Sequence, residues 1–410
     1  MIETNFKHTD IGVIPHDWKV KTLGDIGSIR MCKRIMKHQT SDTGDIPFYK
    51  IGTFGKVADA YISQELYKEF RNKYNFPKKG DILLSAAGTI GRTVVYDGKP
   101  AYFQDSNIVW IENNKQFVIN ELLYYLYHRV NWITDTGTIP RIYNGNVGSI
   151  LIPLPPTLAE QEKIANALSK IDQLINDLGV LIEKKKAIKQ GTMQDLLTAK
   201  RRLKGCTGKW IEKTIEELGI LTGAGVDKKS SEDETPIRLV NYLDVFKRDY
   251  IFQKELDFWV TANEGKKHQC NVLKGDIFFT PSSEMPYDIA LSALAMEDMP
   301  NVCYSYHIYR LRLNEDIDFL YRAYMFKSDS FYSQANQTCE GSGKRYVISL
   351  SKFKQMTVTY PSSKKEQRAI ANVLSSMDTE ITNLEQKRDK YIAIKQGMMQ
   401  NLLTGKIRLI

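Results

Sequence analysis

The sequence is poor in the residues from which disulfide frameworks and metal centres are built. Its 410 residues include five cysteines and six histidines. The cysteines are odd in number, scattered and without a CxxC pair, which argues against a disulfide framework or a zinc site and favours reduced thiols in a cytoplasm. The histidines are dispersed and show no HExxH or other metal-ligand spacing. We therefore expect no metal site and a cytoplasmic location.

Long apolar runs are also missing. Residues 1–10 are polar, and no apolar stretch approaches the length that spans a membrane. We therefore expect no membrane partner. The hydrophobic content of 42% and the charged content of 26% are ordinary for a globular protein, and the length suffices for two or three domains.

No motif meets the requirements of a catalytic or cofactor site. Residues 341–344 resemble a phosphate-binding loop but lack its first glycine and the Ser/Thr after the lysine. Residues 223–225 form a lone GxG, which is a weak sign of an adenosylmethionine or dinucleotide site. Residues 183–185 match the acid-x-lysine end of a nuclease site but have no second acid nearby. The sequence thus predicts no catalytic residue and no cofactor in this chain.

One stretch occurs twice, 206 residues apart. Residues 160–198 reappear as residues 366–404, with Glu-Gln at the start of each copy and Leu-Leu-Thr at the end. The copies align without a gap, and self-similarity at a fixed offset indicates a duplication. The whole chain is therefore interpreted as a tandem repeat.

Apolar residues in both copies alternate steps of four and three, which is the seam of a coiled coil. The seam residues are Ile164, Leu168, Ile171, Ile175, Leu178 and Ile182, then Ile370, Leu374, Met377, Ile381 and Leu384. Because domain termini tend to lie close together, we expect the two helices, about 60 Å long, to pair antiparallel. The simpler alternative is a pair of long core helices. Lys185, Lys189, Arg388 and Lys395 also fall on the seam and predict looser pairing there.

The segments before each helix repeat less closely. Trp18 matches Trp210, and each is predicted to be a packing anchor where a lobe meets its helix. Strand-like and short helical segments also correspond, and helices are expected at 121–130 and 319–326. The predicted fold class is α+β, with two pseudo-symmetric mixed α/β domains joined by two long helices in an antiparallel coiled coil. The expected boundaries are 1–157 for the first domain, 158–204 for the first helix, 205–361 for the second domain and 362–410 for the second helix.

Charge and loop composition point to a polyanionic partner. The net charge is +9, yet residues 205–361 contain 19 basic and 22 acidic side chains. A second lobe that binds nucleic acid must therefore use a local basic patch. The loops after Gly27 and Gly219, and after Ser85 and Thr280, differ between the copies, so one scaffold is expected to display two different recognition surfaces.

With these residues assembled, the chain resembles the specificity (S) subunit of type I restriction–modification enzymes. The resemblance rests on residues 18–27, 79–91, 153–164 and 361–370, and it covers nearly the whole length. It implies two target-recognition domains in a non-catalytic subunit that binds double-stranded DNA at a bipartite site. It also implies two methyltransferase (M) and two restriction (R) subunits as partners, and these would carry S-adenosylmethionine, ATP and Mg. The alternatives are a coiled-coil scaffold with two protein-binding lobes and a stand-alone DNA enzyme.

Candidate contact residues were chosen by charge and by repetition. The candidates for DNA contact are Arg30, Lys33, Arg34, Lys37, Lys50, Arg92, Arg141, Tyr143, Lys228, Lys229, Arg238, Lys247, Arg248, Ser282, Lys344 and Arg345. The candidates for docking M subunits are polar residues that both helices keep although the seam does not require them: Asn166, Gln190, Gln194, Asn372, Gln396 and Gln400. That these amides only solvate the helices is the competing interpretation.

Overall fold

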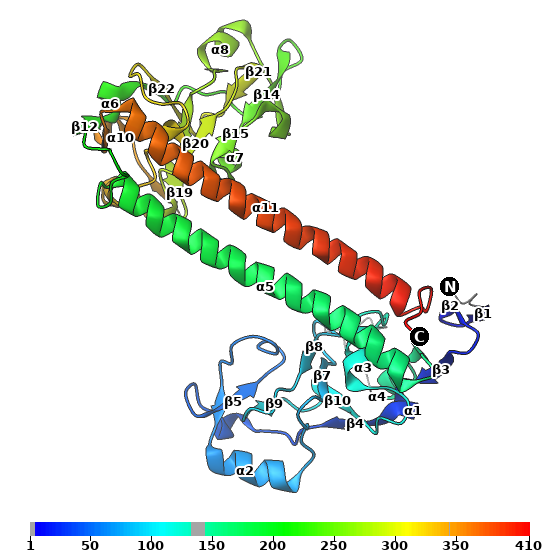
Figure 1. Ribbon diagram of the computed structural model, residues 1–410. Helices are drawn as coiled ribbons and strands as arrows, with labels where there is room; N and C mark the ends of the chain where they lie inside the picture. The colour runs from blue at the N-terminus through cyan, green and yellow to red at the C-terminus, as the bar shows by residue number, and fades with distance from the viewer. Residues whose placement is uncertain (1–4, 133–143, 344) are drawn as a thin grey trace. The chain divides into compact units, whose positions relative to one another are not determined.

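The computed structural model describes residues 5–132, 144–343 and 345–410 and divides into two compact units. The first unit consists of residues 1–179 and 386–410, and the second of residues 180–385. Both divisions fall inside a long helix, α5 (Leu158–Leu197) or α11 (Lys364–Leu402), each of which is continuous (Figure 1). Each unit therefore contains one mixed α/β lobe and one half of each long helix. Neither helix is long and apolar enough to cross a membrane, nor is any other described helix.

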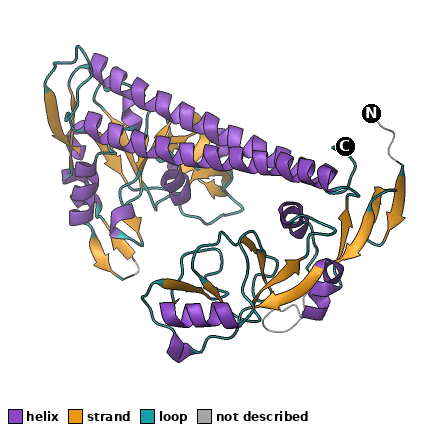
Figure 2. Cartoon of the chain, turned by 60° about the horizontal axis from the view of Figure 1, so that its bottom comes forward, coloured by secondary structure: helices purple, strands orange, loops and turns teal. Residues whose placement is uncertain are grey.

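The strands of the first unit are short and form several small sheets (Figure 2). A four-stranded sheet has the order β4 (Gly27–Met31), β10 (Ile108–Asn113), β7 (Ile82–Ser85) and β8 (Thr93–Val95). A three-stranded sheet has the order β6 (Tyr61–Ile62), β5 (Ile46–Tyr49) and β9 (Tyr102–Phe103). The remaining elements are β1 (Phe6–Thr9), β2 (Gly12–Pro15), β3 (Lys19–Thr22), β11 (Leu151–Leu154), η1 (Lys37–Gln39), α1 (Leu23–Ile26), α2 (Gln64–Lys73), α3 (Asn120–Tyr127) and α4 (Asn144–Gly148).

The second unit has a similar arrangement, but its sheets contain more strands. A five-stranded sheet has the order β13 (Gly219–Thr222), β22 (Tyr309–Leu313), β18 (Ile277–Phe279), β20 (Ser292–Ala295) and β15 (Tyr250–Ile251). A four-stranded sheet has the order β16 (Trp259–Ala262), β14 (Thr235–Val240), β21 (Met299–Tyr304) and β17 (Asn271–Val272). A three-stranded sheet has the order β19 (Ser282–Ser283), β24 (Arg345–Val347) and β23 (Glu340–Ser342). The other elements are β12 (Trp210–Thr214), β25 (Thr357–Pro361), α6 (Ile215–Leu218), α7 (Tyr242–Lys247), η2 (Gln253–Glu255), α8 (Glu264–Gln269), η3 (Pro286–Asp288), η4 (Tyr321–Ala323), α9 (Asp329–Thr338) and α10 (Leu350–Gln355).

Each lobe begins with the same local structure. A strand leads into one helical turn that is closed by a capping box, Thr22 with Asp25 in the first unit and Thr214 with Glu217 in the second. The capping box satisfies backbone N–H groups that a helix start leaves free. The apolar residues of both turns are fully buried, and Trp18 is 1% exposed within the core of the first unit. Trp210 packs against the core of the second unit, so the predicted packing role of both tryptophans is confirmed.

The long helices are antiparallel, as predicted, and contacts inside each unit show it. In the first unit the chain after α11 returns to the start of α5, where Leu402 and Leu403 share a core with Ile164 and Leu168. In the second unit the end of α5 lies at the start of α11 in the corresponding way. Most predicted seam residues are buried, among them Ile164, Leu168, Ile171, Leu178, Ile182, Ile370, Leu374 and Ile381.

At each of the two places where the end of one long helix meets the start of the other, a buried glutamate pairs with an arginine. Glu160 accepts from Arg408 at 2.5 and 2.8 Å, and Glu366 accepts from Arg202 at 2.9 and 2.6 Å. The glutamate side chains are only 3% and 2% exposed. The two glutamates are 206 residues apart, and so are the two arginines. The repeated glutamate of the Glu-Gln pair is therefore a structural residue in both units.

The glutamine that follows each of these glutamates in the sequence forms hydrogen bonds between the lobe and the helix. The Gln161 amide donates to the carbonyls of Phe117 and Pro155 and accepts from the Ile119 N–H. Gln367 likewise donates to Pro361 and accepts from the Asp318 N–H. Both glutamines are buried, and their side chains satisfy backbone groups that burial would otherwise leave unpaired.

Looser pairing is expected at the lysines on the seam, and the structure shows that each of them meets an acid of the facing helix. Lys395 lies 2.6 Å from Asp172, and Lys189 pairs with Asp378 at the equivalent place. Lys185 pairs with Glu380 at 2.6 Å. The exception among the four seam cations is Arg388, which lies 3.0 Å from its neighbour Asp389. One tyrosine of each lobe donates to the aspartate of such a pair: Tyr125 to Asp172 and Tyr324 to Asp378.

Some predicted elements differ from the structure. The helix expected at 121–130 is present as α3, but residues 319–326 contain only the 3-10 turn η4. In that segment Tyr321, Tyr324 and Phe326 are all buried, so core packing decides the backbone rather than helix propensity. The pattern of apolar and polar side chains in residues 103–111 and 303–313 predicts a strand in each. Both segments are interrupted by a turn, and Ser106 has a positive φ of 50°. The helices α2 and α9 were not predicted.

Removal of the buried charge at Glu366 should destabilise the protein. Glu366→Gln keeps the side-chain size but leaves Arg202 without a carboxylate, which should cost about 1–3 kcal/mol of unfolding free energy. Glu160→Gln should act similarly on the first unit. Glu162→Gln, at an exposed position of the same helical turn, is the control. Thermal unfolding of the full chain measures the effect, and equal Tm values for Glu366→Gln and Glu162→Gln would contradict the assigned role.

Candidate functional site

In the first unit two loops that follow different strands come together. One begins after β4 and contains Lys33 and Arg34, and the other precedes β10 and contains Asp105. Arg34 Nε lies 2.8 Å from the Asp105 carboxylate, and the Tyr102 hydroxyl donates to the Lys33 carbonyl. Although Arg34 is ion-paired, its side chain is still 64% exposed. The pairing therefore holds the loop in place and leaves further guanidinium donors accessible.

Other predicted cations of the first unit have intramolecular partners. Arg30 lies 2.9 Å from Glu112, Lys50 lies 2.8 Å from Asp59, and Arg92 donates to the Phe54 carbonyl. Lys33 and Lys37 are exposed, and the Lys33 ammonium lies 5.4 Å from the Tyr74 ring centre. Arg141 and Tyr143 lie outside the described residues.

The same two loops meet in the second unit but carry different side chains. β22 pairs with β13 in the register in which β10 pairs with β4, so His307 stands where the first unit has Asn107. The loop after β13 carries Lys228 and Lys229, both exposed. Desolvation lowers the pKa of His307, and the positive charges of Lys228 and Arg345 lower it further. The structure thus gathers three basic side chains from distant parts of the sequence.

The other candidates of the second unit are more dispersed. Arg238 donates to the Gln253 carbonyl and stacks over Trp259 at 5.1 Å. Arg248, the residue after α7, pairs with Asp244 of that helix at 2.6 Å, and the last helical residue, Lys247, is exposed. Ser282 begins β19, which pairs with β24 next to Arg345. Lys344 lies outside the described residues.

Sequence reasoning missed several exposed aromatic residues beside these cations. Trp259 is 57% exposed and lies under Arg238, and Phe258 is 42% exposed with the Lys228 ammonium 5.4 Å from its ring. Tyr306 is 47% exposed, and its ring centre lies 3.9 Å from that of His307. His307 and Tyr306 could have been found by aligning 303–313 with 103–111, because they occupy the turn that interrupts both strands.

The predicted docking residues fall into two sets, one for each unit. Asn166, Gln396 and Gln400 belong to the first unit, and Asn372, Gln190 and Gln194 to the second. All are exposed except Gln194. The Gln194 amide donates to the Lys327 carbonyl at 3.0 Å and accepts from the Asp329 N–H at 2.7 Å, at the start of α9. An internal contact thus explains Gln194, whereas the exposed amides keep their predicted role as candidates.

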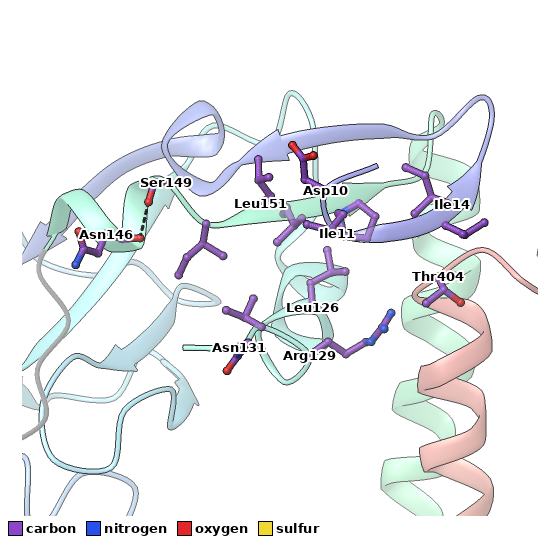
Figure 3. A pocket seen from close by; sticks show the side chains of 15 residues that line it. Asp10, Ile11, Ile14, Leu126, Arg129, Asn131, Asn146, Ser149, Leu151 and Thr404 are labelled. Atoms are coloured by element: carbon purple, nitrogen blue, oxygen red, sulfur yellow. Dashed lines mark hydrogen bonds between the residues drawn. The ribbon is translucent and has the colours of Figure 1, made fainter. Parts of the chain in front are cut away.

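A cavity of about 730 Å³ opens in the first unit beside β11 and α3 (Figure 3). Its wall is mainly apolar, with Asp10 and Arg129 as charged members. Leu151 of this wall corresponds to Thr357 in the second unit, where Gln334 of α9 bonds to both the N–H and the carbonyl of Thr357. The repeated position thus carries an apolar side chain in the first unit and a hydroxyl side chain in the second. We assign no ligand to the cavity, because residues 133–143, next to it in sequence, lie outside the described residues.

No metal-binding chemistry is found in the described ranges 5–132, 144–343 and 345–410, where no group of three or more His, Cys, Asp or Glu side chains could hold an ion. The cysteine thiols at Cys32 and Cys303 are buried, and desolvation raises the pKa of each to about 12. Such thiols are protonated at neutral pH and are poor nucleophiles.

Comparison with known proteins accounts for both halves of the repeat. Residues 15–190 and 208–393 match the type I restriction modification DNA specificity domain. The chain belongs to this family. It is a DNA specificity subunit of a type I restriction–modification system, with two recognition domains, and it is the non-catalytic part of such an enzyme.

Relatives and solved structures agree with this membership. A candidate type I restriction enzyme specificity subunit of Haemophilus influenzae is 57% identical over 161 residues, which is 39% of this chain and 42% of that relative. The MjaVIII specificity subunit of Methanocaldococcus jannaschii is 25% identical over 99% of this chain and 97% of its own length. The crystal structure of a type I S subunit from M. genitalium aligns over 98% of this chain and 97% of its own, with a TM-score of 0.56 and 16% identity. That last similarity concerns the fold alone.

The internal contact of Gln194 gives a test that separates structure from docking. Gln194→Ala should destabilise the second unit by about 1 kcal/mol, because it removes two hydrogen bonds at the start of α9. Gln400→Ala, the equivalent change at an exposed position, is the matched control. Hydrogen exchange of α9 in the full chain measures the difference. Equal protection of α9 in both variants would show that the Gln194 contact contributes nothing to stability.

Proposed function

We propose that this specificity subunit reads a bipartite, non-palindromic DNA site, with one half-site for each unit. The contrast inside the repeat carries the proposal. The Glu–Arg, Lys–Asp and Gln contacts are the same in both units, whereas the paired loops contain Arg34 and Asp105 in one and Lys228 and His307 in the other. Different side chains in equivalent places present different donors and acceptors to base edges.

A spacer of constant length should separate the half-sites. α5 runs without a break from the first unit into the second, and a helix cannot shorten without losing its hydrogen-bonded turns. Neither unit then needs to read the base pairs between the half-sites.

Whether a basic side chain contacts a phosphate or a base should depend on whether another group of the protein fixes its orientation. The exposed residues Lys33, Lys37, Lys228, Lys229, Lys247 and Arg345 suit phosphate contacts, which depend on charge and tolerate flexible side chains. Arg30, Arg34, Arg92, Arg238 and Arg248 are oriented by a carboxylate or a carbonyl and suit directional contacts. Lys50, Ser282, Arg141, Tyr143 and Lys344 stay candidates from the sequence.

The catalytic chemistry should belong to partner subunits. We propose that two M subunits dock on the paired helices, one for each unit, and that R subunits join the complete enzyme. S-adenosylmethionine would then be held by M, and ATP and Mg by R. A cytoplasmic location follows from the proposed DNA partner. The exposed amides Asn166, Gln396 and Gln400 in the first unit and Asn372 and Gln190 in the second support one docking site for each unit.

A domain exchange tests the assignment of one half-site to each unit. Replacing residues 28–145 by the corresponding segment of a related specificity subunit should alter one half of the methylated sequence and leave the other half and the spacer unchanged. Methylation-site mapping of the complex assembled with M measures both halves. The matched control replaces residues 220–347, which should alter the other half alone. A change in both halves after either exchange would contradict independent reading.

Negative charges placed on one docking surface test whether M subunits bind there. The triple variant Asn166→Asp, Gln396→Glu and Gln400→Glu changes the first unit only, so we expect one M subunit to be lost and the other retained. The control is Lys170→Ser, which copies the residue found at the repeated position 376. Native mass spectrometry gives the stoichiometry. Retention of two M subunits by the triple variant would exclude this surface.

A further inference from the structure

We infer that Lys228, His307 and Arg345 form a binding site for one DNA backbone phosphate, and that His307 takes up a proton when the phosphate binds. The inference deepens the proposed reading of DNA by the second unit and rests on it. The site draws on three segments: the loop after β13, the turn between β21 and β22, and the start of β24.

The first two segments are locked together by their backbones. The Val226 N–H donates to the Tyr304 carbonyl at 2.8 Å, and the Tyr306 N–H donates to the Val226 carbonyl at 3.2 Å. A Cβ at Gly225 would lie 2.3 Å from the carbonyl carbon of Ser305, so only glycine permits this approach. The positions of Lys228 and His307 relative to each other are thus set by main-chain contacts.

The side chains around His307 are mainly cationic. Desolvation is the main effect that disfavours a charge on the imidazole, and the exposed cations Lys228 and Arg345 add to it. Asp227 is the acid that opposes them, but its carboxylate also accepts from the Lys228 N–H and lies 4.0 Å from Lys229. The Tyr306 ring lies beside the imidazole at an interplanar angle of 36°. In the first unit the corresponding turn carries Asp105, which pairs with Arg34, whereas the second unit has Ser305 at that position.

A phosphate would reverse this balance. Two cations that repel a proton from His307 in the free protein attract a phosphate dianion or diester, and the bound anion then stabilises the imidazolium. The neutral imidazole gains one proton from solvent, and the site becomes a three-cation clamp. By linkage, binding that takes up a proton becomes tighter as pH falls between the bound-state and free-state pKa values of the histidine.

Affinity measured against pH tests the inference in the complex of the full chain with M. Between pH 8 and pH 6 the wild type should gain up to about tenfold more affinity for its target duplex than His307→Asn, which copies the residue of the first unit. His307→Lys should bind at pH 8 at least as tightly as the wild type and lose the extra pH dependence. His268→Asn is the control histidine of the same unit and should follow the wild type. Parallel pH profiles for the wild type and His307→Asn would overturn the site, and DNA binding itself would remain established.

Histidine NMR of the full wild-type chain gives a second readout. The variant His307→Asn serves only to assign the signal. The His307 signal, assigned by its loss in His307→Asn, should titrate at higher pH once duplex is added at micromolar concentration. Inorganic phosphate at the same concentration should leave it unchanged, because one isolated anion lacks the rest of the DNA interface. A response to phosphate but not to DNA would show a small-anion site instead. Absence of any DNA binding would count against the proposed function as a whole.

Discussion

A buried glutamate at the start of each long helix and an arginine that follows the other helix form the contact on which the rest of the structure depends. Glu160 with Arg408 and Glu366 with Arg202 bring each helix end back to a helix start. A buried ion pair contributes little net stability compared with apolar packing, yet an unpaired buried carboxylate is costly. The pair therefore acts mainly against wrong registers, since a shifted helix would leave the glutamate buried without its partner.

The regular parts of this fold could be predicted from the sequence because they repeat and because their period is strict. The seam from Ile164 to Ile182 and the identical offset of its copy fix both the helices and their pairing. The partners of the seam lysines could not be predicted, because a linear sequence does not show that Asp172 and Asp378 of the facing helices lie opposite Lys395 and Lys189. Their charges are paired across the interface, so the helices stay in contact.

The candidate site was less predictable, since a surface cation has no sequence signature that shows its partner. Arg30 and Arg34 looked equivalent to Lys33 in the sequence, but only the fold brings Glu112 and Asp105 to the two arginines. Similarly, Gln194 and Gln400 are the same residue at repeated positions, and only the fold shows that Gln194 meets the start of α9 whereas Gln400 is exposed. His307 was overlooked because its cationic neighbours come from segments about 80 and 40 residues away.

Charged residues of the helix framework and charged residues of the loops lie in different surroundings. This difference explains how one framework can carry different recognition surfaces. The charges that define the framework are buried or paired between helix and lobe, so a change in one of them disturbs packing. The charges on the loops after β4 and β13 are mostly exposed, and their replacement removes little apolar contact. Loop residues can therefore vary at small cost in folding free energy while the helices cannot. A duplicated chain of this kind can change the bases that one unit reads without altering the helix contacts that join its two halves.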